Sequence, residues 1–170
     1  MSLRPLALLA AAWIGAAPAP APAADLFGAE GRWVGSGSLA TTVTRPMQPA
    51  RCEVDVEQKA DAVDVSVTGR CVVGIGGSNI SMRIVRGDGR DVRGAMWSEA
   101  TGETLQLSGT GEAGAVTLLA TSPWVVDGVS YETMITVNEP DAASFATRQM
   151  VRGPGETAWR VIVDMTYRKP

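Results

Sequence analysis

Histidine is absent from all 170 residues of this chain. Its absence removes the most common general base, the usual proton shuttle and the most common metal ligand of proteins. A Ser-His-Asp triad and most zinc sites are therefore excluded, and no nucleophile-elbow motif suggests a hydrolase. We expect a protein that is not an enzyme and that uses no cofactor and no metal ion.

Blocks of positive charge and long apolar runs are also scarce. The net charge of the whole chain is −3, and no block of Lys and Arg is present. Nucleic acids and anionic membrane surfaces are therefore poor partners. No apolar run after residue 24 is long enough for a membrane-spanning helix, which needs about 20 residues. The expected partners are a small apolar molecule or a protein of the cell envelope or exterior.

Residues 1–23 have the composition of a secretory signal peptide. Arg4 supplies the positive charge, an apolar run covers 6–17, and Ala21-Pro22-Ala23 provides the small residues of a cleavage site. The run is too short for a membrane span, and the Ala-Pro pairs after it cannot continue a helix. We expect cleavage near Ala23, which leaves one domain of residues 24–170 in the bacterial periplasm or outside the cell.

The chain has two cysteines, Cys52 and Cys71. An even number in an oxidising compartment indicates a disulfide, whereas redox pairs have only two residues between their cysteines. Alternation places both side chains on the apolar faces of their strands. A hairpin that turns near residues 60–63 puts Val56 opposite Val67 and Cys52 opposite Cys71. We predict a structural bridge between the two strands of one hairpin.

Short stretches of alternating polarity recur between Gly, Asp and Pro, while helical periodicity is almost absent. Connections are too short for crossover helices, so consecutive strands should pair antiparallel. The predicted fold is all-β, a single up-and-down antiparallel barrel of roughly 8–10 strands, with a two-sheet sandwich as the alternative. Ten candidate strands cover residues 31–40, 51–58, 63–71, 79–86, 90–98, 104–109, 115–121, 129–137, 144–151 and 157–168.

Asp88-Gly89 is the strongest hairpin signal in the chain. A two-residue loop at this dipeptide places Arg93 opposite Ile84, on the core face. An inward guanidinium is costly unless it meets water or a partner, so Arg93 is a candidate handle for a ligand. A register shift at Gly94 and an ion pair between Arg93 and an acidic neighbour are the alternatives.

Aromatic residues are few, and several fall where they could line the barrel. Alternation places Trp97, Tyr131 and Tyr167 on inward faces, and we take them as candidate ligand-binding residues. The alternative is that they fill the interior, which in a small barrel is only wide enough for side chains. Trp124 lies between two predicted strands, where an exposed indole would be a contact site for a ligand or a partner.

The triplet Gly31-Arg32-Trp33 opens the first predicted strand. It resembles the G-x-W motif of calycin-type barrels, the lipocalins and avidins, in which the Trp lies at the closed end. The resemblance implies an antiparallel barrel and a structural role for Trp33. In lipocalins an Arg near the last strand lies over this Trp. The candidates here are Arg160 and Arg168, although alternation places both on the polar face of their strand.

Two functions fit these features. The first is an exported, non-enzymatic binding protein that holds a small apolar ligand in the barrel. The second is a protein-interaction module, either inhibitor-like or an accessory subunit of an envelope complex. The triplet, the barrel and the disulfide are similar to bacterial periplasmic inhibitors of secreted metalloproteases, which implies an arm at residues 24–27 that enters the protease cleft. An open, lined interior favours the first function and a filled core the second.

Overall fold

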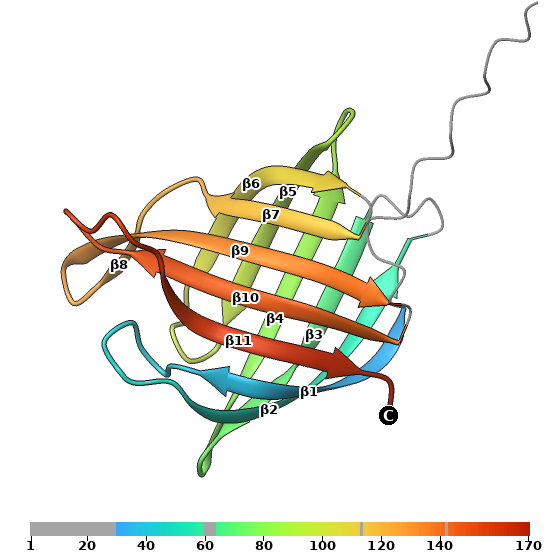
Figure 1. The fold of residues 1–170 in the computed structure, drawn as a ribbon, viewed down its shortest axis with the longest axis horizontal. Coiled ribbons are helices and arrows are strands. Elements are labelled where there is room, and N and C mark those ends of the chain that lie inside the picture. The colour runs from blue at the N-terminus through green and yellow to red at the C-terminus, as the bar shows by residue number, and fades with distance from the viewer. Residues whose placement is uncertain (1–29, 60–63, 113, 142) are drawn as a thin grey trace, which may run out of the picture.

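The computed structural model describes residues 30–59, 64–112, 114–141 and 143–170 (Figure 1). The predicted signal peptide and the predicted arm at residues 24–27 lie outside the described residues. Across the described ranges, no helix combines the length and the apolar character needed to cross a membrane. The chain instead forms strands joined by turns and loops, as its alternating polarity predicts.

The described residues form eleven strands. The first six are β1 (Gly31–Leu39), β2 (Gln48–Gln58), β3 (Asp64–Val73), β4 (Gly76–Arg86), β5 (Asp91–Ser98) and β6 (Thr104–Glu112). The other five are β7 (Ala115–Ala120), β8 (Trp124–Val126), β9 (Val129–Asp141), β10 (Ser144–Arg152) and β11 (Arg160–Arg168). The sequence did not predict β8, because its three residues are too few to show alternation.

The strands follow one another around a closed antiparallel barrel. β1 to β7 pair in chain order, β7 pairs with β9, and β9, β10 and β11 continue the ring. The pairing of β1 with β11 closes it, while β8 pairs with β9 alone. This arrangement confirms the predicted up-and-down barrel, with ten strands in the ring, and excludes the two-sheet sandwich. Closure leaves the ring without a free sheet edge.

The β2–β3 hairpin has the predicted register. Cys52 pairs with Cys71 and Val56 with Val67, and the two cysteines form a disulfide. Both cysteines are buried, as alternation predicted. The bridge therefore joins two neighbouring strands on the inner side of the barrel.

The β4–β5 hairpin does not have the predicted register. The amide of Gly87 donates to the carbonyl of Asp91 over 2.7 Å, so three residues rather than two form the connection. The extra residue shifts β5 by one position, and Ile84 pairs with Gly94. A shift of one residue turns every side chain of a strand to the opposite face. The prediction of an inward Arg93 is therefore wrong, and its side chain is exposed on the outside of the barrel.

Aromatic side chains from β1, β10 and β11 close one end of the barrel. The Trp33 indole is fully buried and packs edge-on against Phe145, with 5.0 Å between the ring centroids. Phe145 stacks in turn on Tyr167, at a centroid distance of 4.5 Å. The three rings form a floor, which we call the aromatic floor. It gives Trp33 the structural position that the G-x-W resemblance implied.

A lysine rather than an arginine lies over Trp33. The Lys169 Nζ is 4.4 Å from the centre of the indole ring. The prediction of Arg160 or Arg168 in this position is wrong: Arg160 donates to the carbonyl of Val43, and Arg168 is exposed. Lys169 follows the last residue of β11, where strand alternation no longer fixes the direction of the side chain.

The carboxylate of Asp64 lies in an ion cluster where β3 meets β4. Arg83 donates Nε to Oδ1 over 2.9 Å and Nη2 to Oδ2 over 2.6 Å, and the Lys59 Nζ is 2.7 Å from Oδ2. The aspartate side chain is 8% exposed, while both cations are more than half exposed. The hydrogen bonds from Arg83 and Lys59 hold the pKa of Asp64 well below its ordinary value.

Replacing Asp64 with Asn should lower the melting temperature at neutral pH, and should lower it by less in acid. A carboxylate whose pKa is lowered by folding stabilises the fold above its ordinary pKa of 3.8, and this contribution declines as the pH falls below that value. We expect the difference in melting temperature between Asp64→Asn and the wild type, measured by circular dichroism, to be constant from about pH 5 to 8 and to shrink toward about pH 3.

The control is Asp164→Asn, which removes an exposed ion pair with Arg148. Exposed pairs contribute little, so its melting temperature should stay close to that of the wild type at every pH. A difference for Asp64→Asn that persists undiminished in acid would contradict the role assigned to the ionised carboxylate.

Candidate ligand-binding cavity

A cavity of about 380 Å³ lies inside the barrel, between the aromatic floor and the opposite end. Phe145 and Tyr167 line its bottom, while Thr41 and Thr101 line it from the β1–β2 and β5–β6 connections. We call this open end the mouth; in Figure 1 the β1–β2 connection lies at the left and the C-terminus at the right. The volume falls within the range of about 300–1,000 Å³ that is typical of small-molecule sites.

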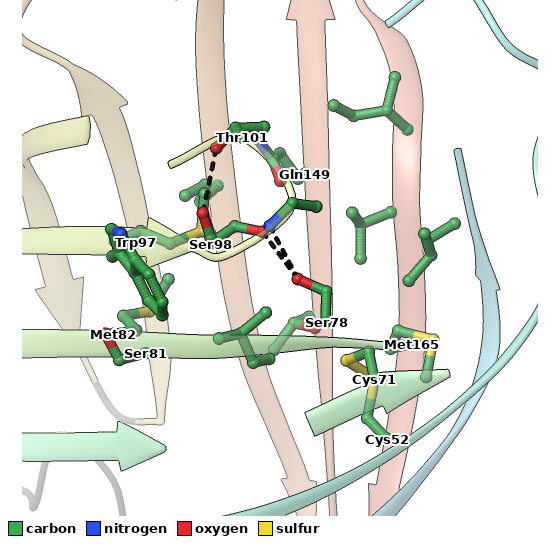
Figure 2. Close-up of a pocket in the computed structure, with 18 of the residues that line it drawn as sticks. Cys52, Cys71, Ser78, Ser81, Met82, Trp97, Ser98, Thr101, Gln149 and Met165 are labelled. Carbon is green, nitrogen blue, oxygen red and sulfur yellow. Dashed lines mark hydrogen bonds between the residues drawn. A yellow bond between two sulfur atoms is a disulfide. The ribbon is translucent and has the colours of Figure 1, made fainter. Parts of the chain in front are cut away.

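Apolar side chains form most of the cavity wall. The aliphatic ones include Val67, Ile80, Leu105 and Ile135. Three methionines, Met82, Met96 and Met165, also face it, and Figure 2 shows Met82 and Met165 on different sides together with the Cys52–Cys71 disulfide. Methionine is unbranched and polarizable, so these side chains can adjust the wall to the shape of a ligand.

Three uncharged polar side chains from β10 and β11 line the cavity: Thr147, Gln149 and Tyr167. Gln149 is 9% exposed, and none of the described residues hydrogen-bonds to its side-chain amide. Tyr167 shares a hydrogen bond with Thr147. Burial raises the pKa of the Tyr167 phenol, which is therefore uncharged at neutral pH. Alternation along β10 explains the arrangement, because Phe145, Thr147 and Gln149 point to the same side.

Ser78 joins β4 to the β5–β6 connection at the mouth (Figure 2). Its hydroxyl accepts a hydrogen bond from the Ala100 amide at 3.0 Å and lies 3.4 Å from the Ser98 hydroxyl. The Thr101 hydroxyl donates to the carbonyl of Ser98 over 3.3 Å. These bonds hold the connection beside the opening, and they line this part of the mouth with neutral polar groups.

The charged groups of the described lining lie at the rim and on the outside of the cavity. Two of the described lining residues carry a charge, Glu103 and Arg148. Glu103 is exposed at the mouth. Arg148 alternates with the inward Thr147 and Gln149, and its guanidinium pairs with Asp164 over 2.9 Å. Along the described wall, the interior therefore presents apolar groups and neutral hydrogen-bonding groups.

Trp97 does not have its predicted neighbours. The one-residue shift that turned Arg93 outward also pairs Trp97 with Ser81 instead of Ile80. Trp97 alternates with the inward Met96 and borders a shallow groove on the outer surface of β1 to β4. Trp97 also lines the cavity, so it forms part of the wall between the cavity and the outer groove. Its role in ligand binding stays a prediction.

Of the other predicted ligand residues, Trp124 and Tyr167 line the cavity, and Tyr131 is not among the described residues that do. Trp124 is buried rather than exposed, because it begins β8 and pairs with Tyr131. Tyr131 is buried next to Gly153, where an added Cβ would come within 3.3 Å of its ring. The short β8 thus directs the Trp124 indole into the barrel.

The sequence analysis did not select Thr147 and Gln149 as cavity residues, although the alternation of their strand relates them to Phe145. Alternation in the predicted strand 144–151 puts both on the same face as Phe145. The opposite face contains Ser144 and Arg148 together with small and apolar residues, so both faces mix polar and apolar side chains. The pattern therefore could not decide which face is inward.

Comparison with protein-family models and with curated proteins finds no match for this chain. Within the described ranges, no group of three or more Cys, Asp or Glu side chains is placed to hold a metal ion. The description of the candidate site therefore rests on the geometry of the cavity. It is an apolar cavity with an aromatic floor, an open mouth and a few neutral hydrogen-bonding groups.

Proposed function

We propose that this chain is an exported, non-enzymatic binding protein that holds one small, largely apolar molecule in its barrel. The observation that carries the proposal is the cavity of about 380 Å³ with its apolar wall. Transfer of an apolar ligand from water into such a site supplies binding free energy roughly in proportion to the area buried. This function requires no reactive group in the wall.

Two further features support the proposal. Disulfides such as Cys52–Cys71 persist in oxidising compartments, which supports a periplasmic or extracellular location. The ten-strand ring, with Trp33 in the aromatic floor, agrees with the calycin resemblance, whereas Lys169 takes the place of the expected arginine. We therefore propose a calycin-like binding barrel.

Partly filling the cavity should weaken the binding of a neutral apolar dye such as Nile red. Met96 faces the cavity, and Trp in its place would occupy part of the free volume. Titration of the wild type, followed by dye fluorescence, should saturate at one dye per protein. We expect Met96→Trp to weaken binding by at least about tenfold.

The matched control is Ala95→Trp, which places the same ring on the outer face of β5. It should bind the dye like the wild type. Equal binding by Met96→Trp and the wild type would put the dye elsewhere and contradict the proposal. A second measurement is native mass spectrometry of protein purified from the periplasm, which should show one small molecule per chain.

A further inference from the structure

Along the described wall of the cavity, the Gln149 amide has no hydrogen-bond partner, and the charged groups of Glu103 and Arg148 lie at the rim or on the outside. This combination restricts the class of ligand. We infer that the ligand is an uncharged molecule with an apolar body and one polar group, of the alcohol, ketone or carboxamide type, which hydrogen-bonds to Gln149. Carboxylates with the same apolar body are excluded from the cavity. The inference rests on the proposed function and specifies its ligand class.

The first observation is the state of Gln149. Its side chain is 9% exposed and lines the cavity, and no described residue hydrogen-bonds to its amide. The amide is not among the described polar atoms that are sealed from water without a partner, so its hydrogen bonds are left to whatever occupies the cavity. A ligand that bonds to this amide would take the place of water there. The amide both donates and accepts, so it suits either a carbonyl or a hydroxyl group.

The second observation is where Gln149 lies. Its partners on the neighbouring strands are Ile135 of β9 and Val163 of β11, both apolar and both lining the cavity. The other polar pair on this side, Thr147 and Tyr167, is already joined by a hydrogen bond. Among the described residues of β9, β10 and β11 that line the cavity, Gln149 is therefore the neutral polar side chain left without a partner, and it marks where the polar group of the ligand would lie.

The third observation is the placement of the charges around the cavity. The Arg148 guanidinium pairs with Asp164 on the outside, and Arg70 borders the outer groove. Glu103 at the mouth is negative and would repel an anion. A carboxylate drawn inside would lose its water without gaining a cation from the interior of the described wall, which is strongly unfavourable.

The experiment compares ligands with the same chain and different head groups. Calorimetric titrations with decanamide, decanol and decanoate are done near pH 8, where the carboxylic acid is fully ionised. Decanamide and decanol should bind, and decanoate should bind at least about tenfold more weakly. Hexylbenzene, which has no polar group, serves as the apolar reference.

Two variants test the role of Gln149. Gln149→Met keeps the length of the side chain and should lower the affinity for decanamide by roughly three- to tenfold, the effect of one hydrogen bond, while leaving hexylbenzene binding unchanged. Gln106→Met, on the exposed outer face of β6, is the matched control and should change neither. Gln149→Lys should reverse the preference, so that decanoate binds more tightly than decanamide.

The outcomes separate this inference from the proposed function. If the wild type binds all four probes with equal affinity, the proposed function stands and the ligand class is wrong. If decanamide is preferred but Gln149→Met binds it as the wild type does, the assignment to Gln149 is overturned. If no probe binds, both proposals fall. Should Gln149→Lys not fold, the comparison of Gln149→Met with Gln106→Met still tests whether Gln149 binds the polar group of the ligand.

Discussion

Replacement of Trp33 by Ala is expected to lower the free energy of unfolding by about 3–5 kcal/mol. The indole is fully buried, packs against Phe145 at 5.0 Å, and has the Lys169 ammonium 4.4 Å from its centre. Truncation would remove this apolar area and open a gap in the aromatic floor that neighbouring strands cannot fill. Urea unfolding followed by circular dichroism measures the change as a lower midpoint at an unchanged slope.

Trp97→Ala is the matched control, since it removes the same ring from the outer groove, where the side chain is only partly buried. We expect less than half of the loss seen for Trp33→Ala, because less apolar area leaves water on folding. Equal losses for the two variants would contradict the structural role given to Trp33.

Removal of the Cys52–Cys71 disulfide is the second large effect, with an expected loss of about 3 kcal/mol. The two cysteines are 19 positions apart, and a cross-link over a loop of this size restricts the unfolded chain. Both sulfurs are also buried in the barrel wall. The double variant Cys52→Ala, Cys71→Ala should therefore unfold at a clearly lower urea concentration.

A reductant distinguishes the contribution of the disulfide bond from that of side-chain packing, because reduction breaks the bond and leaves the two cysteine side chains in place. It should lower the free energy of unfolding of the wild type by about as much as the double alanine substitution does. The same reductant should leave the double alanine variant unchanged. If the wild type unfolded at the same urea concentration with and without reductant, the bridge would contribute nothing to stability.

In the β2–β3 hairpin, the local sequence pattern was enough to predict the pairing of the strands. Alternation placed Cys52, Val56, Val67 and Cys71 on one face, and the length of the connection fixed their pairing, so the disulfide could be predicted. The same reasoning failed at the β4–β5 hairpin, where one additional residue in the connection moved Arg93 and Trp97 to the other face. Side-chain direction has a period of two, so an error of one residue reverses it.

Other features depended on residues far apart in the chain. Lys169 reaches Trp33 because β11 returns beside β1 and closes the ring. Trp124 enters the cavity through a strand too short to show a pattern. Gln149 lies on a strand whose two faces look alike in polarity, so only its neighbours, Ile135 and Val163, establish that it points inward.

Composition and the alternation of neighbouring segments were enough to predict the all-β class, the succession of antiparallel strands and the pairing of the two cysteines. Composition also excluded histidine chemistry. The closure of ten strands into a ring, and the space left inside it, became clear from the three-dimensional fold. The width of a barrel depends on the number of strands that close it, and whether inward side chains meet across that width cannot be read from any single strand.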